Sequence, residues 1–90
     1  MPTPYHPPVK QSMALHGHRT SISLEPVFWA MLKEAAAEEG VPLARLVARI
    51  DAERIAATPA PGLASAVRVW LVTRARGGRI APAAPPDTLA

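Results

Sequence analysis

The 90-residue sequence has no cysteine, which excludes disulfide bonds as a source of stability. Its soft metal ligands are limited to three histidines, and we expect neither a metal nor another cofactor. It also lacks any run of about 18 apolar residues, so we expect no membrane-spanning helix. The N-terminus does not show the basic-then-apolar order of a signal peptide. These absences favour a cytoplasmic protein.

Aromatic residues are scarce as well, with two Trp, one Tyr and one Phe. Hydrophobic residues make up 49% of the chain, but many of them are alanines, which bury little area. The sequence has no cysteine nucleophile, no Gly-x-Ser-x-Gly motif, no phosphate-binding glycine loop and no carboxylate pair beside a histidine. We therefore do not expect an enzyme.

The 11 prolines lie mostly near the two ends. We expect residues 1–15 to be a flexible N-terminal arm, residues 16–76 the folded domain, and residues 77–90 a disordered tail rich in proline and alanine. A folded part of about 60 residues is marginally stable alone. With disulfides excluded and metals not expected, oligomerisation is the remaining way to stabilise it.

The formal net charge is +3, and its distribution is uneven. Residues 1–24 contain Lys10 and Arg19 but no acidic residue, and residues 64–80 contain four arginines but no acidic residue. Most acidic residues lie between Glu25 and Glu53. This pattern fits either a polyanionic partner or an ordinary soluble surface.

One segment has the period of a half-buried strand. From His18 to Leu24, polar and apolar side chains alternate: Arg19, Ser21 and Ser23 fall on one side, and Thr20, Ile22 and Leu24 on the other. A lone strand leaves its backbone N–H and C=O groups without partners. Because no other segment resembles a strand, we expect this one to pair with its copy in a second chain.

Three helices follow the strand. We expect them at Pro26–Glu39, from Pro42 to about Ala57, and at about Leu63–Arg74, with Gly40 ending the first. Apolar residues at helical spacing, together with the inner face of the strand, are expected to form a dimer core: Ile22, Leu24, Phe28, Leu32, Leu46, Val47 and Ile50. The fold class is thus mainly α with one β-strand. A helix-turn-helix with Gly40-Val41-Pro42 as its turn is an alternative that leaves the strand unexplained.

The run His18–Glu25 (HRTSISLE), followed by Phe28-Trp29, Leu32-Lys33-Glu34 and Ala36, resembles the short ribbon-helix-helix proteins of bacteria, in particular a subgroup common in alphaproteobacteria. The resemblance covers roughly residues 16–73. It implies an intertwined homodimer whose intermolecular two-stranded antiparallel ribbon enters the major groove of double-stranded DNA, with a third helix in addition. The implied function is a sequence-specific transcriptional regulator, a repressor associated with the bacterial nucleoid.

The resemblance also implies site residues. It places base contacts at Arg19, Ser21 and Ser23, and a phosphate contact at the backbone N–H groups that begin the second helix, those of Val41, Leu43 and Ala44. Pro42 removes one donor there, so Arg45 is a candidate substitute. His18 is a further candidate for phosphate contact. Because serine bonds to any base, discrimination is expected to depend largely on Arg19.

Several assignments have two interpretations. Trp29 packs either at a dimer seam or under the third helix. Arg49 either extends a phosphate-facing row from Arg45 or pairs with Glu53. Arginines at and after the end of the third helix either attract phosphates or are stabilised by the negative end of the helix dipole. An alternative function is an antitoxin-like interaction module, whose third helix or tail binds a partner protein. Dimers associating further on DNA also fit the sequence.

Overall fold

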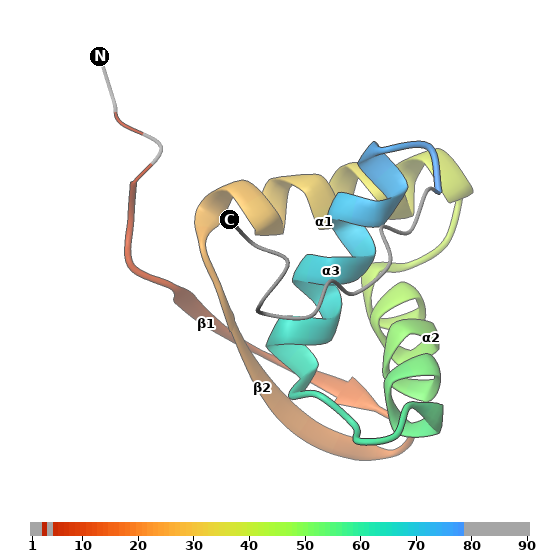
Figure 1. Ribbon diagram of the computed structural model, residues 1–90. Helices are drawn as coiled ribbons and strands as arrows, with labels where there is room; N and C mark the ends of the chain where they lie inside the picture. Colours follow the sequence, from red (N-terminus) through yellow and green to blue (C-terminus); the bar gives the residue numbers. More distant parts are fainter. Residues whose placement is uncertain (1–2, 4, 79–90) are drawn as a thin grey trace, which may run out of the picture.

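The computed structural model describes Thr3 and residues 5–78, so residues 79–90 of the tail expected at 77–90 lie outside this range. The elements are β1 (Val9–Leu15), β2 (His18–Leu24), α1 (Pro26–Glu39), α2 (Leu43–Ala56) and α3 (Leu63–Ala75). Figure 1 shows the two strands side by side, with their shared turn next to the lower end of α2. Within the described range, no helix has the length and apolarity required to cross a bilayer.

The two strands form an antiparallel hairpin inside one chain. The register pairs Val9 with Leu24 and Leu15 with His18. His16 and Gly17 make the turn with φ angles of 51° and 79°, the left-handed conformation that tight hairpins require. The expectation that the chain offers β2 no second strand was therefore wrong, whereas the pairing of β2 with its copy in a second chain stays a prediction. The flexible arm expected at residues 1–15 was wrong from Val9 onward.

The second strand was missed because its own signal is weak. Side chains of β1 alternate between partly buried and exposed positions, but the inward set includes the polar Gln11 and only one β-branched residue, Val9. Two prolines precede it, which favours an extended arm in sequence terms. A contact distant in sequence holds the strand in place: the Trp29 indole Nε1 donates a 2.9 Å hydrogen bond to the Val9 carbonyl oxygen.

The first helix begins and ends where the sequence indicated. Pro26 occupies the first turn, where a missing N–H costs nothing. Gly40, with φ of 67°, closes the helix by donating its N–H to Ala37, and the N–H of Val41 donates 3.0 Å to the Ala36 carbonyl. The expected bounds of α2 and α3 agree with the observed ones to within a residue at each end.

The core lies between the inner face of the hairpin and the three helices. Its buried apolar residues are Leu15, Ile22, Leu24, Trp29, Leu32, Ala35, Ala36, Leu46, Val47, Ile50, Ala66, Val67 and Leu71. Six of the seven residues expected in a dimer core are among them, and Phe28 packs partly buried against the cluster. One chain thus buries these side chains by itself, with β1 and α3 supplying the cover.

Ion pairs join α3 to the rest of the fold. Arg68 Nη2 lies 2.8 Å from a carboxylate oxygen of Glu25, and the Arg68 guanidinium lies 5.7 Å from the centre of the Phe28 ring. At the other end of α3, Arg74 contacts Glu38 and Glu39 at 3.0 and 2.8 Å. The third helix is therefore an integral layer of the domain.

Candidate nucleic-acid interface

The outer face of the hairpin carries the predicted base-contacting residues. Arg19, Ser21 and Ser23 are exposed, whereas Ile22 and Leu24 on the other face of β2 are buried. The side-chain alternation that predicted this face is confirmed. Because these three side chains stand on one strand of a twisted ribbon, they form a continuous outward row.

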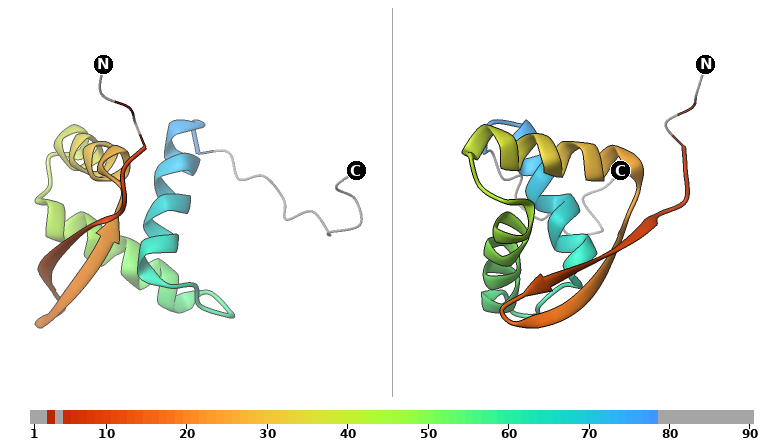
Figure 2. Two further views of the ribbon diagram at one scale, coloured as in Figure 1. Left: turned by 90° about the vertical axis from the view of Figure 1, so that its left-hand side faces the viewer. Right: turned by 180° about the vertical axis from the view of Figure 1, so that it is seen from behind.

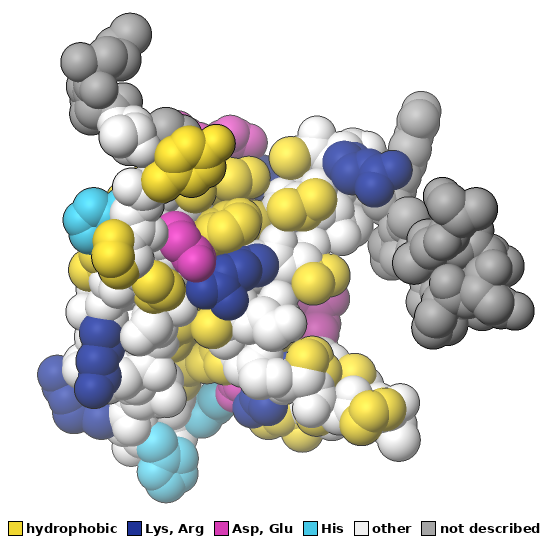
Figure 3. Space-filling model, turned by 60° about the vertical axis from the view of Figure 1, so that its left-hand side comes forward, with side chains coloured by type: hydrophobic (Ala, Val, Ile, Leu, Met, Phe, Trp, Pro, Cys, Tyr) yellow, Lys and Arg dark blue, Asp and Glu magenta, His cyan; other side chains and the backbone are white. Residues whose placement is uncertain are grey.

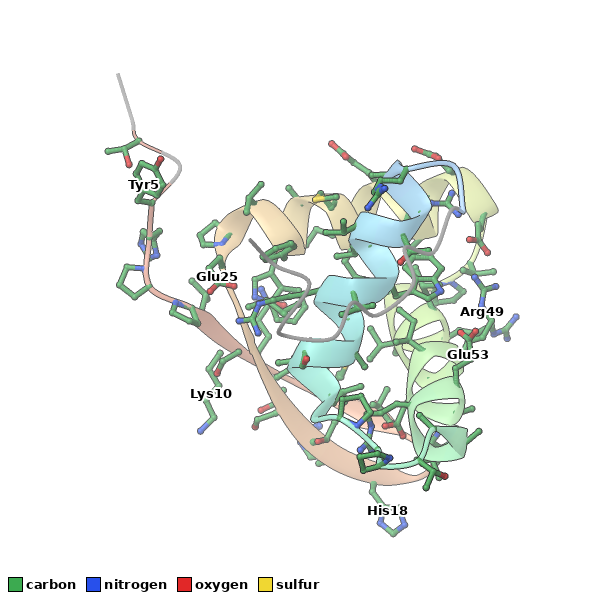
Figure 4. The ribbon with its side chains drawn as sticks, viewed as in Figure 1. Tyr5, Lys10, His18, Glu25, Arg49 and Glu53 are labelled. Atoms are coloured by element: carbon green, nitrogen blue, oxygen red, sulfur yellow. The ribbon has the colours of Figure 1, made fainter. Side chains whose placement is uncertain are left out.

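The neighbouring strand adds a second outward row, which the sequence interpretation missed. Lys10 lies opposite Ser23, Ser12 opposite Ser21, and Ala14 opposite Arg19. The Oγ atoms of Ser12 and Ser21 are 3.3 Å apart, within hydrogen-bond distance across the strands. Figure 4 shows Lys10 pointing away from the helices. We define the outer face as Lys10, Ser12, Ala14, Arg19, Ser21 and Ser23. The same period of two that identified β2 was present at Lys10, Ser12 and Ala14.

The outer face keeps its positive charge. The hairpin strands contain no acidic residue, and the Lys10 and Arg19 side chains form no ion pair with any described residue. Elsewhere most charge is neutralised, because Arg49, Arg54, Arg68 and Arg74 are all engaged with carboxylates of the same chain. In Figure 3 basic side chains without an acidic neighbour lie at the lower left. Arg68 and Arg74 of α3 therefore form ion pairs that stabilise the fold. Lys10 and Arg19 leave the outer face with a positive charge that no described acid neutralises.

The two histidines of the hairpin end differ in orientation. The Nε2 atom of His16 lies 3.7 Å from Oδ2 of Asp51, a carboxylate that is only 8% exposed and that also accepts a 2.8 Å hydrogen bond from Arg54. His16 is therefore turned toward α2. His18 is exposed and projects away from the helices (Figure 4), next to a cleft of about 580 Å³ that it lines with Arg19 and Thr20. Its predicted role in phosphate contact stays a prediction.

The start of α2 is only partly suited to the predicted phosphate contact. The Val41 N–H already donates to Ala36, so it is not available to a ligand. The N–H groups of Leu43 and Ala44 have no backbone acceptor among the described residues, and no side chain caps this helix. The contact between His16 and Asp51 brings the late part of α2 to the hairpin turn, so its start lies at the other end of the helix (Figure 1). One chain does not bring the two predicted sets of residues together.

The predicted arginine row on α2 is also divided. Arg45 is exposed and forms no ion pair with any described residue, so it remains available to a phosphate. Arg49 instead contacts Glu39 at 2.7 Å, and its guanidinium lies 5.8 Å from the centre of the Trp70 ring. The partner of Arg49 is therefore an acid of α1 rather than Glu53.

Glu25 links the hairpin to the helices. It stands between β2 and α1, and its carboxylate accepts a 3.0 Å hydrogen bond from Nε of Arg68. A hydrogen bond from its own backbone, followed by the one from Arg68, holds the pKa of Glu25 below its usual range. The carboxylate is consequently ionised at neutral pH and neutralises Arg68.

The fold consists of a hairpin with an exposed polar face and of helices that cover its apolar face. Known proteins have the same arrangement. The model of the ribbon-helix-helix domain family matches residues 8–75, and the chain belongs to this family, whose members typically bind DNA. The match includes β1, and it sets aside the helix-turn-helix alternative. Among solved structures, the chain is similar to an uncharacterized protein from Bordetella pertussis Tohama I, with 30% identity and a TM-score of 0.62. This similarity covers 92% of the present chain and 71% of the other. Curated proteins gave no match.

Proposed function

We propose that this protein is a sequence-specific transcriptional regulator, a repressor, which inserts the outer face of its hairpin into the DNA major groove. The observation that carries the proposal is the exposed face itself, with two unneutralised cations and four small side chains on a two-stranded ribbon. A ribbon of this kind fits the major groove, which is about 12 Å wide. Membership of the ribbon-helix-helix family supports the same surface.

The proposed contacts follow from side-chain chemistry. Arg19 donates two hydrogen bonds to O6 and N7 of a guanine, which is worth about 1–3 kcal/mol of discrimination against other bases. Ser21 and Ser23 accept or donate single hydrogen bonds. Their small size lets the ribbon fit into the groove, and they contribute little to discrimination between bases. Lys10, at the opposite end of the ribbon and on the other strand, contacts a phosphate. Backbone N–H groups of Leu43 and Ala44, with Arg45, are proposed as additional phosphate contacts.

We further propose that the repressor acts as a homodimer in the bacterial cytoplasm, bound to the nucleoid. A single hairpin presents few base-reading side chains, and discrimination against a genome requires the sum of several contacts. Two copies double the number of contacts. The family to which the chain belongs supports this assembly.

The decisive experiment is selection of binding sites from random DNA with the full chain, followed by affinity measurements at several salt concentrations. We expect a recovered consensus and an affinity that falls as salt rises, because phosphate contacts release counterions. Arg19→Ala should lose the consensus. Lys33→Ala, which removes an exposed cation of α1 outside the hairpin, is the matched control and should retain it. A chain without salt-sensitive affinity for any DNA would contradict the proposal.

A further inference from the structure

A groove of about 840 Å³ runs between α2 and α3, and the end of α1 borders it. Its apolar lining consists mainly of Ile50 from α2 and of Ala66, Val69 and Trp70 from α3. Ile50 and Ala66 are buried and form the floor, whereas Val69, at 63% exposure, belongs to the outward side of α3. In the left view of Figure 2, α3 lies at the edge of the molecule with no other helix or strand beyond it. Small-molecule sites have volumes of about 300–1,000 Å³ and mostly apolar walls.

The ion pairs around the groove leave one negative charge without a partner. Arg49 and Arg74 line the groove, and both contact Glu39, while Arg74 also contacts Glu38. Glu53 lines the groove beside Arg49 (Figure 4), but it forms no ion pair with any described residue. Three acids and two arginines thus face this space, so its local charge is opposite in sign to the net +3 of the chain.

Trp70 gives the groove a fixed aromatic surface. Its ring is partly buried, and the guanidinium groups of Arg49 and Arg74 lie 5.8 and 5.6 Å from its centre. Both arginines are held in turn by ion pairs with α1. A wall that is already ordered reduces the entropy lost when a ligand binds.

We propose that this groove binds a small organic molecule with one positive charge and an apolar, aromatic body. The charged end lies at Glu53, and the body packs against Trp70 and Val69. An anion fits less well, because both arginines that could receive it are already paired. A concave space bordered by three helices also suits a small molecule better than the flat surface of a protein.

Titration calorimetry of the full chain tests the proposal with tetraphenylphosphonium, an aromatic monocation whose charge does not depend on pH. Tetraphenylborate, which has the same shape and the opposite charge, is the matched control. We expect one cation bound per chain and an affinity for the anion at least about threefold lower, although the chain as a whole is positive. In nuclear magnetic resonance spectra, the cation should shift the indole signal of Trp70 and not that of Trp29, which is 4% exposed and hydrogen-bonded to Val9.

Two pairs of variants test the proposed contacts. Glu53→Gln should lower the affinity for the cation by about two- to fivefold, the range of an exposed ion pair. Glu34→Gln, at an exposed acid of α1 outside the groove, should leave this affinity unchanged. Val69→Lys should lower it by about tenfold or more, because an apolar contact is replaced by a like charge. Val27→Lys, at the 48% exposed valine of α1, is its control, and circular dichroism reports whether each variant is folded.

Equal affinity for the two probes, a shift confined to Trp29, or an equal loss in Glu53→Gln and Glu34→Gln would each overturn the proposal. An absence of binding to the full chain would also overturn it and would leave residues 79–90 or another protein as the occupant. The groove shares no residue with the outer face of the hairpin, so the proposal does not rest on DNA binding. Arg19→Ala should therefore leave the affinity for the cation unchanged.

Discussion

The indole of Trp29 on α1 donates its hydrogen bond to the carbonyl oxygen of Val9, 20 residues earlier in the chain. Trp29 is only 4% exposed, so this bond is formed in a largely water-free environment. It holds the first residue of β1 against the first turns of α1. The position of the outer row containing Lys10 and Ser12 therefore depends on a residue of the core.

Replacing Trp29 by Phe should loosen β1 selectively. The change removes a hydrogen bond worth about 0.5–1.5 kcal/mol and leaves a small void in the core, so we expect a total loss near 1–3 kcal/mol in the free energy of unfolding. Urea denaturation measures the loss, and hydrogen exchange should show the amides that pair β1 with β2 losing more protection than those of the helices. Tyr5→Phe, at an 87% exposed aromatic, should change neither measurement. An equal loss of protection in the hairpin and in the helices would contradict the role assigned to Trp29.

The two cations of the outer face should affect DNA binding in different ways. Lys10→Ala removes a phosphate contact, so it should weaken binding to all sequences alike and lower the salt slope by about one. Arg19→Ala removes a base contact, so it should cost about 1–3 kcal/mol on the preferred sequence and little on others. Fluorescence anisotropy with the selected site and a scrambled site separates the two effects. If both variants lose affinity equally on both DNAs, Arg19 does not read bases.

Acid should weaken the junction between Glu25 and α3. The pKa of Glu25 is lowered in the folded chain, so its contribution to stability is fully present above the pKa of the unfolded chain. It is lost as the pH falls through the folded-state value. Glu25→Gln should therefore reduce stability near neutral pH and flatten the decrease in melting temperature between about pH 5 and pH 3. An unchanged acid profile in this variant would show that the pair with Arg68 does not act on stability.

Removing core volume from α3 should destabilise the whole domain. Leu71 is 2% exposed, and Leu71→Ala should cost about 2–5 kcal/mol because the cavity is only partly refilled. Since α3 covers the residues that β2 and α2 bury, we expect one cooperative transition at lower denaturant concentration. Circular dichroism and Trp fluorescence should give the same midpoint. Two separate transitions would mean that α3 unfolds independently of the rest.

Local signals in the sequence predicted much of this fold. Pro26 and Pro42 fix φ where helices begin, and Gly40 permits the left-handed φ that ends α1, so the helix boundaries follow from single residues. The alternation in β2 likewise predicted which of its side chains face outward. These features depend on near neighbours in the chain, which is why a single sequence reveals them.

The parts that were missed depend on contacts distant in sequence. The strand β1 is weak in its own propensity and is held by β2 and Trp29, so Lys10 and Ser12 did not stand out as site residues. The predicted core residues are buried, but the elements that cover them include β1 and α3 of the same chain. Likewise, the Val41 N–H was predicted to contact a phosphate, but it donates to the Ala36 carbonyl oxygen in the cap of α1.

In the left view of Figure 2, the hairpin lies at one side of the molecule and α3 at the other. A ligand that contacts the outward side of α3 therefore does not compete with DNA for the outer face of the hairpin. One chain can form both contacts at the same time.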